Sequence, residues 1–220
     1  MIKAQNLLKT VPLAGGGLEI LRGINLEIKP GETAAIVGVS GSGKSTLLGL
    51  LAGLDVATGG DVLIDGVALS QLDEDARAAL RAQKVGFVFQ SFQLLPALTA
   101  LENVMLPMEL SGHVSPERPA RAFLERVGLA ERCDHYPTML SGGEQQRVAI
   151  ARAFAAQPAI LFADEPTGNL DGETGSKIID LLFELNETEG TTLVLVTHDD
   201  RLAARCGRRF RMENGRLEAA

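Results

Sequence analysis

The chain has 220 residues, of which 45% are hydrophobic and 22% are charged, a composition typical of one large globular α/β domain. Its formal net charge of −7 disfavours nonspecific binding to nucleic acid, which depends on neutralising phosphates with basic side chains. Two cysteines far apart in sequence, Cys133 and Cys206, indicate a reducing compartment and no zinc site. No stretch reaches the roughly 20 apolar residues that cross a bilayer, and the N-terminus lacks a signal core, so we expect no direct membrane insertion.

The first strands of the chain lead to a glycine-rich turn. Residues 17–32 predict two strands with turns, the last at Pro30-Gly31, and residues 33–37 predict a short buried strand. The stretch GVSGSGKST follows at residues 38–46, and residues 46–54 predict an apolar helix. Strand, glycine-rich turn and helix form the context in which a phosphate-binding loop occurs.

The turn itself matches the pattern G-x-x-x-x-G-K-[ST]. In such a turn the backbone N–H groups and the positive end of the helix face an anion, Lys44 reaches the β- and γ-phosphates, and the Ser45 hydroxyl reaches Mg²⁺. The alternative, a flexible glycine turn before a core helix, is disfavoured by the flanking strand and helix. We therefore expect a nucleotide to be held by neighbouring residues of the turn: Gly38, Ser40, Gly41, Ser42, Gly43, Lys44, Ser45 and Thr46.

The middle of the chain changes from strands to helices. Residues 59–66 predict a strand, residues 73–83 a helix with acidic residues first, and residues 84–90 a strand that ends at Gln90. From about residue 91 to residue 157 the β-rich runs stop, which indicates an α-helical block inserted into an α/β core. Three helices are expected there, in residues 98–110, 115–129 and 141–157.

The last third predicts two buried strands, residues 159–165 and 191–199, joined by an amphipathic helix at residues 172–190. This order indicates a parallel sheet, in which ligands bind beyond the carboxyl ends of the strands. Asp164 and Glu165 stand at such an end, where Asp164 suits Mg²⁺ and Glu165 suits polarising a water in line with the γ-phosphate. The alternative is an acid pair that caps the next turn.

Three further polar residues follow strands of this core. Gln90 is placed to sense Mg²⁺ or the attacking water and to move with the helical block. His198 has the position to hydrogen-bond the γ-phosphate, although a lone histidine is more often structural. Asp171, in the stretch GNLD, comes soon after the acid pair and is expected near the same site.

The stretch LSGGEQQR at residues 140–147 contains a second helix start. Ser141 and Glu144 form a capping-box pattern, which explains the stretch as an ordinary helix N-terminus. Gly142 and Gly143, however, each cost about 1 kcal/mol of helix stability. Glycines in such a place allow another group to approach the backbone closely. An exposed helix start with a serine binds phosphate, so the chain has two such starts, which need not serve the same nucleotide from the same subunit.

In this order, the motifs resemble those of the nucleotide-binding subunit of an ATP-binding-cassette (ABC) system across essentially the whole chain. GVSGSGKST is similar to the Walker A motif, ILFADE to Walker B with its glutamate, and LSGGE to the family signature. The resemblance implies an α/β fold with a P-loop NTPase (RecA-like) core, an antiparallel β subdomain and an inserted α-helical subdomain. It implies one ABC ATPase domain over residues 1–220, with residues 91–157 as the helical subdomain.

The resemblance also implies a shared site and a membrane partner. Two copies pack head to tail on ATP binding, with ATP and Mg²⁺ between Walker A of one copy and Ser141 and Gly143 of the other. An integral membrane permease-type subunit docks near Gln90, and we expect Phe92 and Leu95 to contribute to that surface. The chain is then cytoplasmic and peripheral to the inner membrane through its partner.

Catalytic roles follow from the same resemblance. Glu165 is the general base, and His198 holds the γ-phosphate and the attacking water. The Mg²⁺ shell is expected to contain Ser45, Gln90 and Asp164. A P-loop switch with negligible turnover is the alternative, and Glu165 argues against it.

At a finer level, stretches such as SGSGKSTLLGLLAGLD and LFADEPTGNLD resemble the MacB/LolD group, and GETAAIVG and LAARC resemble its YbbA-like members. The resemblance implies a membrane subunit that acts on lipoproteins, lipids or envelope stress, often through mechanical work. A soluble ABC-type ATPase acting on nucleic acid is the alternative function. It is disfavoured because the chain has no long coiled coil between Gln90 and the signature, no cysteine clusters and only one cassette.

One position departs from the family pattern. The family commonly stacks adenine on an aromatic residue upstream of Walker A, and Val11 stands at that place here. Val11 gives apolar contact without ring stacking, so we expect a weak base contact. The alternative source of a ring is Tyr136, which precedes the signature serine and would approach the partner's nucleotide in the dimer.

Overall fold

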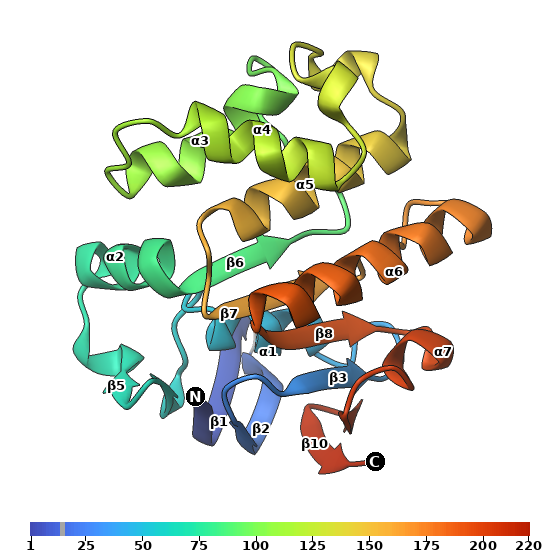
Figure 1. The fold of residues 1–220 in the computed structure, drawn as a ribbon. Helices are drawn as coiled ribbons and strands as arrows, with labels where there is room; N and C mark the ends of the chain where they lie inside the picture. Colours follow the sequence, from blue (N-terminus) through green and yellow to red (C-terminus); the bar gives the residue numbers. More distant parts are fainter. Residues whose placement is uncertain (14–15) are drawn as a thin grey trace. The chain divides into compact units, whose positions relative to one another are not determined.

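The computed structural model describes residues 1–13 and 16–220 of the chain, and Figure 1 shows its elements in chain order. These residues fall into two compact units. The first holds residues 1–81 and 192–220, and the second holds residues 82–191. The helix α2 (Glu74–Lys84) carries the chain from the first unit into the second.

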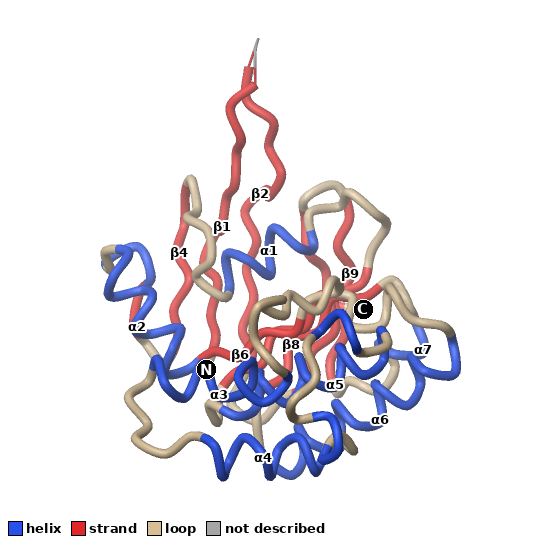
Figure 2. The backbone as a smooth tube through the Cα atoms, turned by 90° about the horizontal axis from the view of Figure 1, so that it is seen from above, coloured by secondary structure: helices blue, strands red, loops and turns tan. Residues whose placement is uncertain are grey.

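One sheet of the first unit is antiparallel. Its strands, in the order β2-β1-β4-β5, are β1 (Ile2–Leu13), β2 (Gly16–Ile28), β4 (Gly59–Ile64) and β5 (Val67–Ala68). Figure 2 shows β1 and β2 running side by side as a long pair. The prediction of two strands in residues 17–32 is wrong, because β2 spans most of this range without a break. Asn6 and Gly23 take left-handed backbone angles where the register of β1 and β2 shifts, so Gly23 forms a bulge rather than a turn.

The first unit also contains a mainly parallel set of strands. They are, in spatial order, β10 (Arg216–Ala219), β9 (Arg208–Glu213), β3 (Thr33–Val37) and β8 (Thr192–Thr197). β3 is parallel to both β8 and β9, whereas β10 is antiparallel to β9. The strands predicted at residues 33–37 and 191–199 are confirmed as apolar, almost wholly buried runs. The helix α1 (Lys44–Leu51) packs against β8, and α7 (Asp200–Ala203) packs against β3 and β8.

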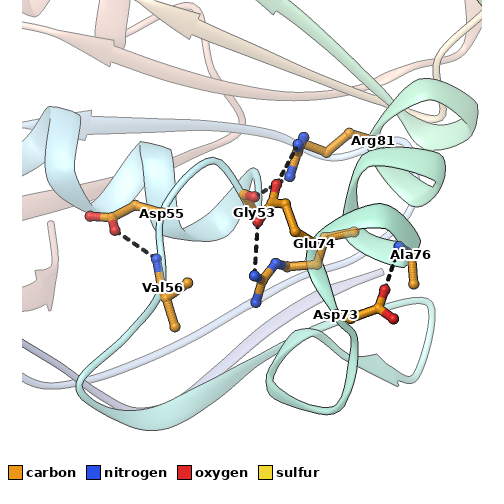
Figure 3. A network of polar contacts seen from close by, with 8 residues as sticks. Gly53, Asp55, Val56, Asp73, Glu74, Ala76 and Arg81 are labelled. Carbon is orange, nitrogen blue, oxygen red and sulfur yellow. Dashed lines mark hydrogen bonds and ion pairs between the residues drawn. The ribbon is translucent and has the colours of Figure 1, made fainter.

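A polar network fixes the start of α2 (Figure 3). Asp73 accepts a backbone N–H of the first turn at 2.8 Å, and Glu74 forms ion pairs with Arg77 and Arg81 at 2.9 and 3.0 Å. Hydrogen bonds from Arg77 and then from Arg81 hold the pKa of Glu74 below its ordinary value. Arg81 also donates to the carbonyl oxygen of Gly53, just past α1, at 2.6 Å, so the acidic start of α2 is tied to the end of α1.

The second unit is mainly helical. Its helices are α3 (Ala100–Leu110), α4 (Glu117–Arg126), α5 (Gly142–Ala155) and α6 (Gly172–Glu189), and its strands are β6 (Val85–Val88) and β7 (Ile160–Asp164). β6 and β7 are parallel, and α5 packs against α3, α4, α6 and β6. Phe154 of α5 and Phe162 of β7 are fully buried in this core. The predicted helices and strands are therefore found in this part of the chain.

Both cysteines are buried free thiols. Cys133, in the second unit, donates to the carbonyl oxygen of Ala130 at 3.2 Å. Burial raises the pKa of the Cys206 thiol, in the first unit, to about 11. No helix in residues 1–13 and 16–220 combines the length and the apolar character that a membrane span requires.

Candidate nucleotide-binding site

The glycine-rich loop follows β3 and leads into α1, and its path requires two of its glycines. A side chain at Gly38 would collide with the carbonyl oxygen of Met212 on β9. Gly43 is the N-cap of α1 with a φ of 103°, a left-handed conformation that residues with side chains disfavour. The sequence pattern does not predict β9, yet the loop packs directly against this strand at Met212.

The amine of Lys44 folds back over its own loop. Its Nζ donates to the carbonyl oxygens of Gly38 at 2.8 Å and Val39 at 3.0 Å, and the residue is only 8% exposed. The loop therefore positions the ammonium group that the motif directs at phosphate oxygens.

Ser42 carries a polar atom that the protein leaves unsatisfied. Its Oγ has no hydrogen-bond partner among the residues that the structure describes, although the residue is only 6% exposed. An unpaired buried hydroxyl costs about 1–3 kcal/mol, so the loop favours a ligand or water oxygen beside Ser42. Of the other loop residues, Ser40, Gly41 and Ser45 are exposed and Thr46 is half-buried.

An open cavity of about 350 Å³ adjoins the loop. Its lining includes Leu18, Ile20 and Arg22 of β2, Gly41 and Ser42 of the loop, and Asn214 after β9. Val11 is half-buried on β1 and pairs with Leu18, but it is not part of this lining. Sequence reasoning did not single out Arg22 or Asn214, because no motif marks a strand residue or a turn residue that lines a cavity.

The acid pair stands at a strand end in the second unit, as its sequence position predicts. β7 ends at Asp164, and Glu165 follows with a left-handed φ of 46°. The carbonyl oxygen of Glu165 accepts the N–H of Gly168 at 3.0 Å, so the chain turns directly after the pair. Both acidic side chains are half-buried.

Gln90 lies beside the segment that follows this turn. β6 ends at Val88 rather than at Gln90. The Nε2 of Gln90 donates to Asn169 Oδ1 at 3.3 Å, and the Nδ2 of Asn169 donates to the Gln90 carbonyl oxygen at 3.0 Å. A Cβ on Gly168 would lie 2.6 Å from Gln90 Nε2. Asn169 is therefore a neighbour of the site that sequence reasoning did not single out, although it lies within GNLD.

Asp171 caps α6. Its Oδ1 accepts the backbone N–H groups of Glu173 and Thr174 at 3.1 and 3.0 Å. Hydrogen bonding from Thr174 holds the pKa of Asp171 below its ordinary value. Its carboxylate thus serves the start of a helix, and its contact with nucleotide stays a prediction.

The signature stretch forms the predicted capping box. The Oγ of Ser141 accepts the Glu144 N–H at 3.3 Å, and the N–H and Oγ of Ser141 both donate to Glu144 Oε2 at 2.8 Å. The pKa of Glu144 lies below its ordinary value, mainly because its carboxylate accepts the hydrogen bond from the Ser141 N–H. Ser141 itself is exposed, so the start of α5 is open to a ligand from outside its unit's core.

The two glycines of this stretch differ in their surroundings. A Cβ on Gly143 would lie 2.6 Å from Thr174 Cγ2 on α6, so Gly143 allows α5 and α6 to pack closely. A Cβ on Gly142 would meet only ordinary contacts, with Leu170 at 3.4 Å and Phe92 at 3.7 Å. The packing of α5 on α6 within this chain therefore requires a glycine at position 143, whether or not a ligand approaches it.

The predicted site residues are divided between the two units. The loop, Val11 and the exposed His198, which directly follows β8, belong to the first unit. The second unit holds Gln90, Asp164, Glu165, Ser141, Gly142, Gly143 and Asp171.

A phosphate-binding loop after a parallel strand, an acid pair after another strand and a serine-capped helix start are together the features of an ATP-binding cassette. The chain matches the family model described as ABC transporter over residues 21–168, and it belongs to this family. It is an ATPase of the ABC type, with the P-loop NTPase fold that its sequence predicts.

Individual relatives are similar over nearly the whole chain. The ABC transporter ATP-binding protein YbbA of Escherichia coli K12 is 58% identical over 220 residues, which cover 99% of this chain and 96% of YbbA. The lipoprotein-releasing system ATP-binding protein LolD of Alcanivorax borkumensis is 48% identical over 219 residues, with 99% and 96% covered. A dimeric structure of the ATP-binding cassette MJ0796 bound to ADP and Pi has a TM-score of 0.92 and 45% identity, with 99% of this chain and 97% of that chain covered. The predicted resemblance to the MacB/LolD group and its YbbA-like members is confirmed.

Proposed function

We propose that this ATPase works as a head-to-tail dimer and drives an integral membrane permease-type subunit. The main observation that supports a dimer is that Ser141 is exposed at the start of α5, where helix N–H groups favour an anion. We assign this start, with Gly142 and Gly143, to the nucleotide of a second copy. The similar cassette MJ0796, described as a dimer bound to ADP and Pi, supports the assignment.

In this proposal the loop residues from Gly38 to Thr46 hold the phosphates of ATP. The unsatisfied Ser42 hydroxyl and the preset Lys44 amine fit such a ligand. Val11 contacts the adenine base without stacking on it.

Mg²⁺ fits the oxygen donors of this chain. Ser45, Gln90 and Asp164 offer hydroxyl, amide and carboxylate oxygens, the ligand types that Mg²⁺ prefers. The bound ion supplies neutralisation of phosphate charge. Glu165 takes the proton of the attacking water, and His198 donates a hydrogen bond to the γ-phosphate.

We further propose where the membrane subunit binds and what it acts on. The docking surface lies in residues 91–110, where Leu95 is 44% exposed and Phe92 is half-buried. LolD is named for lipoprotein release, which supports lipoproteins or lipids as the substrate class. The chain is then cytoplasmic, peripheral to the inner membrane, and forms one domain over residues 1–220 with a helical subdomain at residues 91–157.

Dilution tests the shared site. Total hydrolysis should fall more steeply than protein concentration once dimers dissociate, because each site needs a second copy, so turnover per subunit should decline on dilution. Ser141→Arg should stop hydrolysis while the monomer still binds ATP. The matched variant Ser111→Arg places the same charge on an exposed serine at the end of α3 and should retain activity. Constant turnover per subunit in a demonstrated monomer range would contradict the proposal.

A further inference from the structure

The turn after Gln90 has an unusual backbone. Phe92 and Gln93 are consecutive residues with left-handed φ angles of 59° and 49°. Residues with a Cβ adopt such angles at a cost in free energy, so the surrounding structure must hold them in place. Within the turn, the Gln93 N–H donates to the Ser91 carbonyl oxygen at 2.6 Å.

Arg152, on the last turn of α5, binds both strained residues. Its Nη1 donates to the Gln93 carbonyl oxygen at 2.6 Å, and its Nη2 donates to the Phe92 carbonyl oxygen at 2.9 Å. The planar guanidinium fork fixes two adjacent carbonyl groups at once, which a single ammonium group does not do with the same geometry. Arg152 is half-buried, and burial lowers its pKa.

The same segment is also held at its far end. Asn103 of α3 is fully buried, and its Oδ1 accepts the Leu95 N–H at 2.8 Å. Its Nδ2 donates to the carbonyl oxygens of Leu95 and Leu98 at 3.1 and 3.0 Å. The half-buried Arg152 and the buried Asn103 therefore define the path of a segment that has no regular secondary structure.

We infer that Arg152 is a positioning residue that sets the place of Gln90 and links it rigidly to the helix that begins at Ser141. Ser141 and Arg152 stand at the two ends of α5, about 16 Å apart along the helix axis at 1.5 Å per residue. A shift of the Gln90 turn is transmitted through the fork to the whole helix, and so to its start. We call the two hydrogen bonds from Arg152 to the carbonyl oxygens of Phe92 and Gln93 the clamp. The catalytic consequence rests on the proposed role of Gln90, whereas the clamp itself does not.

Amide hydrogen exchange tests the clamp independently of catalysis. Arg152→Met removes both donors and keeps a long side chain, so the amides of residues 91–95 should exchange about tenfold faster or more. Arg126→Met is the matched control, because it removes an ion pair of the same unit, with Glu189 at 2.6 Å, away from the turn. Unchanged exchange in residues 91–95 of Arg152→Met would overturn the inference.

Kinetics of the purified ATPase test the link to Gln90. Arg152→Met should lower kcat about tenfold, with KM for Mg·ATP within about twofold, because the phosphate loop is untouched. In a Gln90→Ala background the same change should lower kcat by less than about twofold. Equal losses in both backgrounds overturn the link, whereas wild-type kcat in Gln90→Ala alone overturns the proposed role of Gln90. If Arg152→Met does not fold, Arg152→Lys replaces it in both measurements with the same comparison and the same criteria.

Discussion

Glu165 combines a half-buried carboxylate with a left-handed backbone directly after a buried strand. Backbone strain of this kind persists where the surrounding structure fixes a side chain in one direction. The arrangement suits a general base, which must stay aimed at one water molecule.

Replacing this carboxylate separates binding from chemistry. Glu165→Gln keeps the size and the hydrogen bonding of the side chain but cannot accept a proton, so turnover should fall about 10²- to 10⁴-fold. ATP binding should persist, and the ATP-bound dimer should live longer, because hydrolysis precedes opening. Phosphate release and size-exclusion chromatography measure the two effects, with the exposed Glu187→Gln as control. Phosphate release near the wild-type rate would remove Glu165 from this role.

At the residue scale, the sequence predicts what local motifs determine. The cap at Ser141 and the acid pair at the end of β7 follow from short patterns, and the structure shows both positions. Asn169 and Arg152 escape such reasoning, because their partners lie 79 and 60 positions away in the chain. Only the fold brings them to the Gln90 turn.

Between elements, the contact of α5 with α6 sets a limit on one signature position. Gly143→Ala would place a methyl group 2.6 Å from Thr174 Cγ2, whereas Gly142→Ala meets only ordinary contacts. Gly143→Ala should therefore lower the free energy of unfolding by about 1–3 kcal/mol, and Gly142→Ala should be neutral or stabilising.

Denaturant unfolding of both variants measures this difference. Thr174→Ser removes the crowding methyl group and keeps the hydroxyl, so the loss caused by Gly143→Ala should shrink to less than about 1 kcal/mol in that background. An equal loss in both backgrounds would mean that another contact makes Gly143 necessary.

Elements were predictable where the hydrophobic pattern was strong. The apolar runs of β3 and β8 read as buried strands because they are covered on both faces. β9 and β10 could not be read in the same way, because exposed arginines interrupt their apolar positions. Gly23 favours a turn on local grounds, and only pairing with β1 makes it a bulge.

For the whole molecule, nucleotide binding should raise stability by mass action. With ATP at about 100 times its Kd, the free energy of unfolding should rise by about 2.7 kcal/mol. EDTA should reverse part of this gain, because the proposed oxygen ligands Ser45, Gln90 and Asp164 act through Mg²⁺. Thermal unfolding of Glu165→Gln with ATP, with and without EDTA, avoids turnover during the scan. A gain that is the same with EDTA would contradict a role for the ion in binding.

The two buried thiols make the chain a convenient host for chemical probes. Burial raises the pKa of Cys206 to about 11, which disfavours the reactive thiolate at neutral pH, and Cys133 is 5% exposed. A cysteine introduced at an exposed position, such as Thr138, would therefore react with maleimide dyes far faster than either native thiol. Fluorescent labels and crosslinkers placed in this way would test whether nucleotide moves the helical unit, without a cysteine-free background.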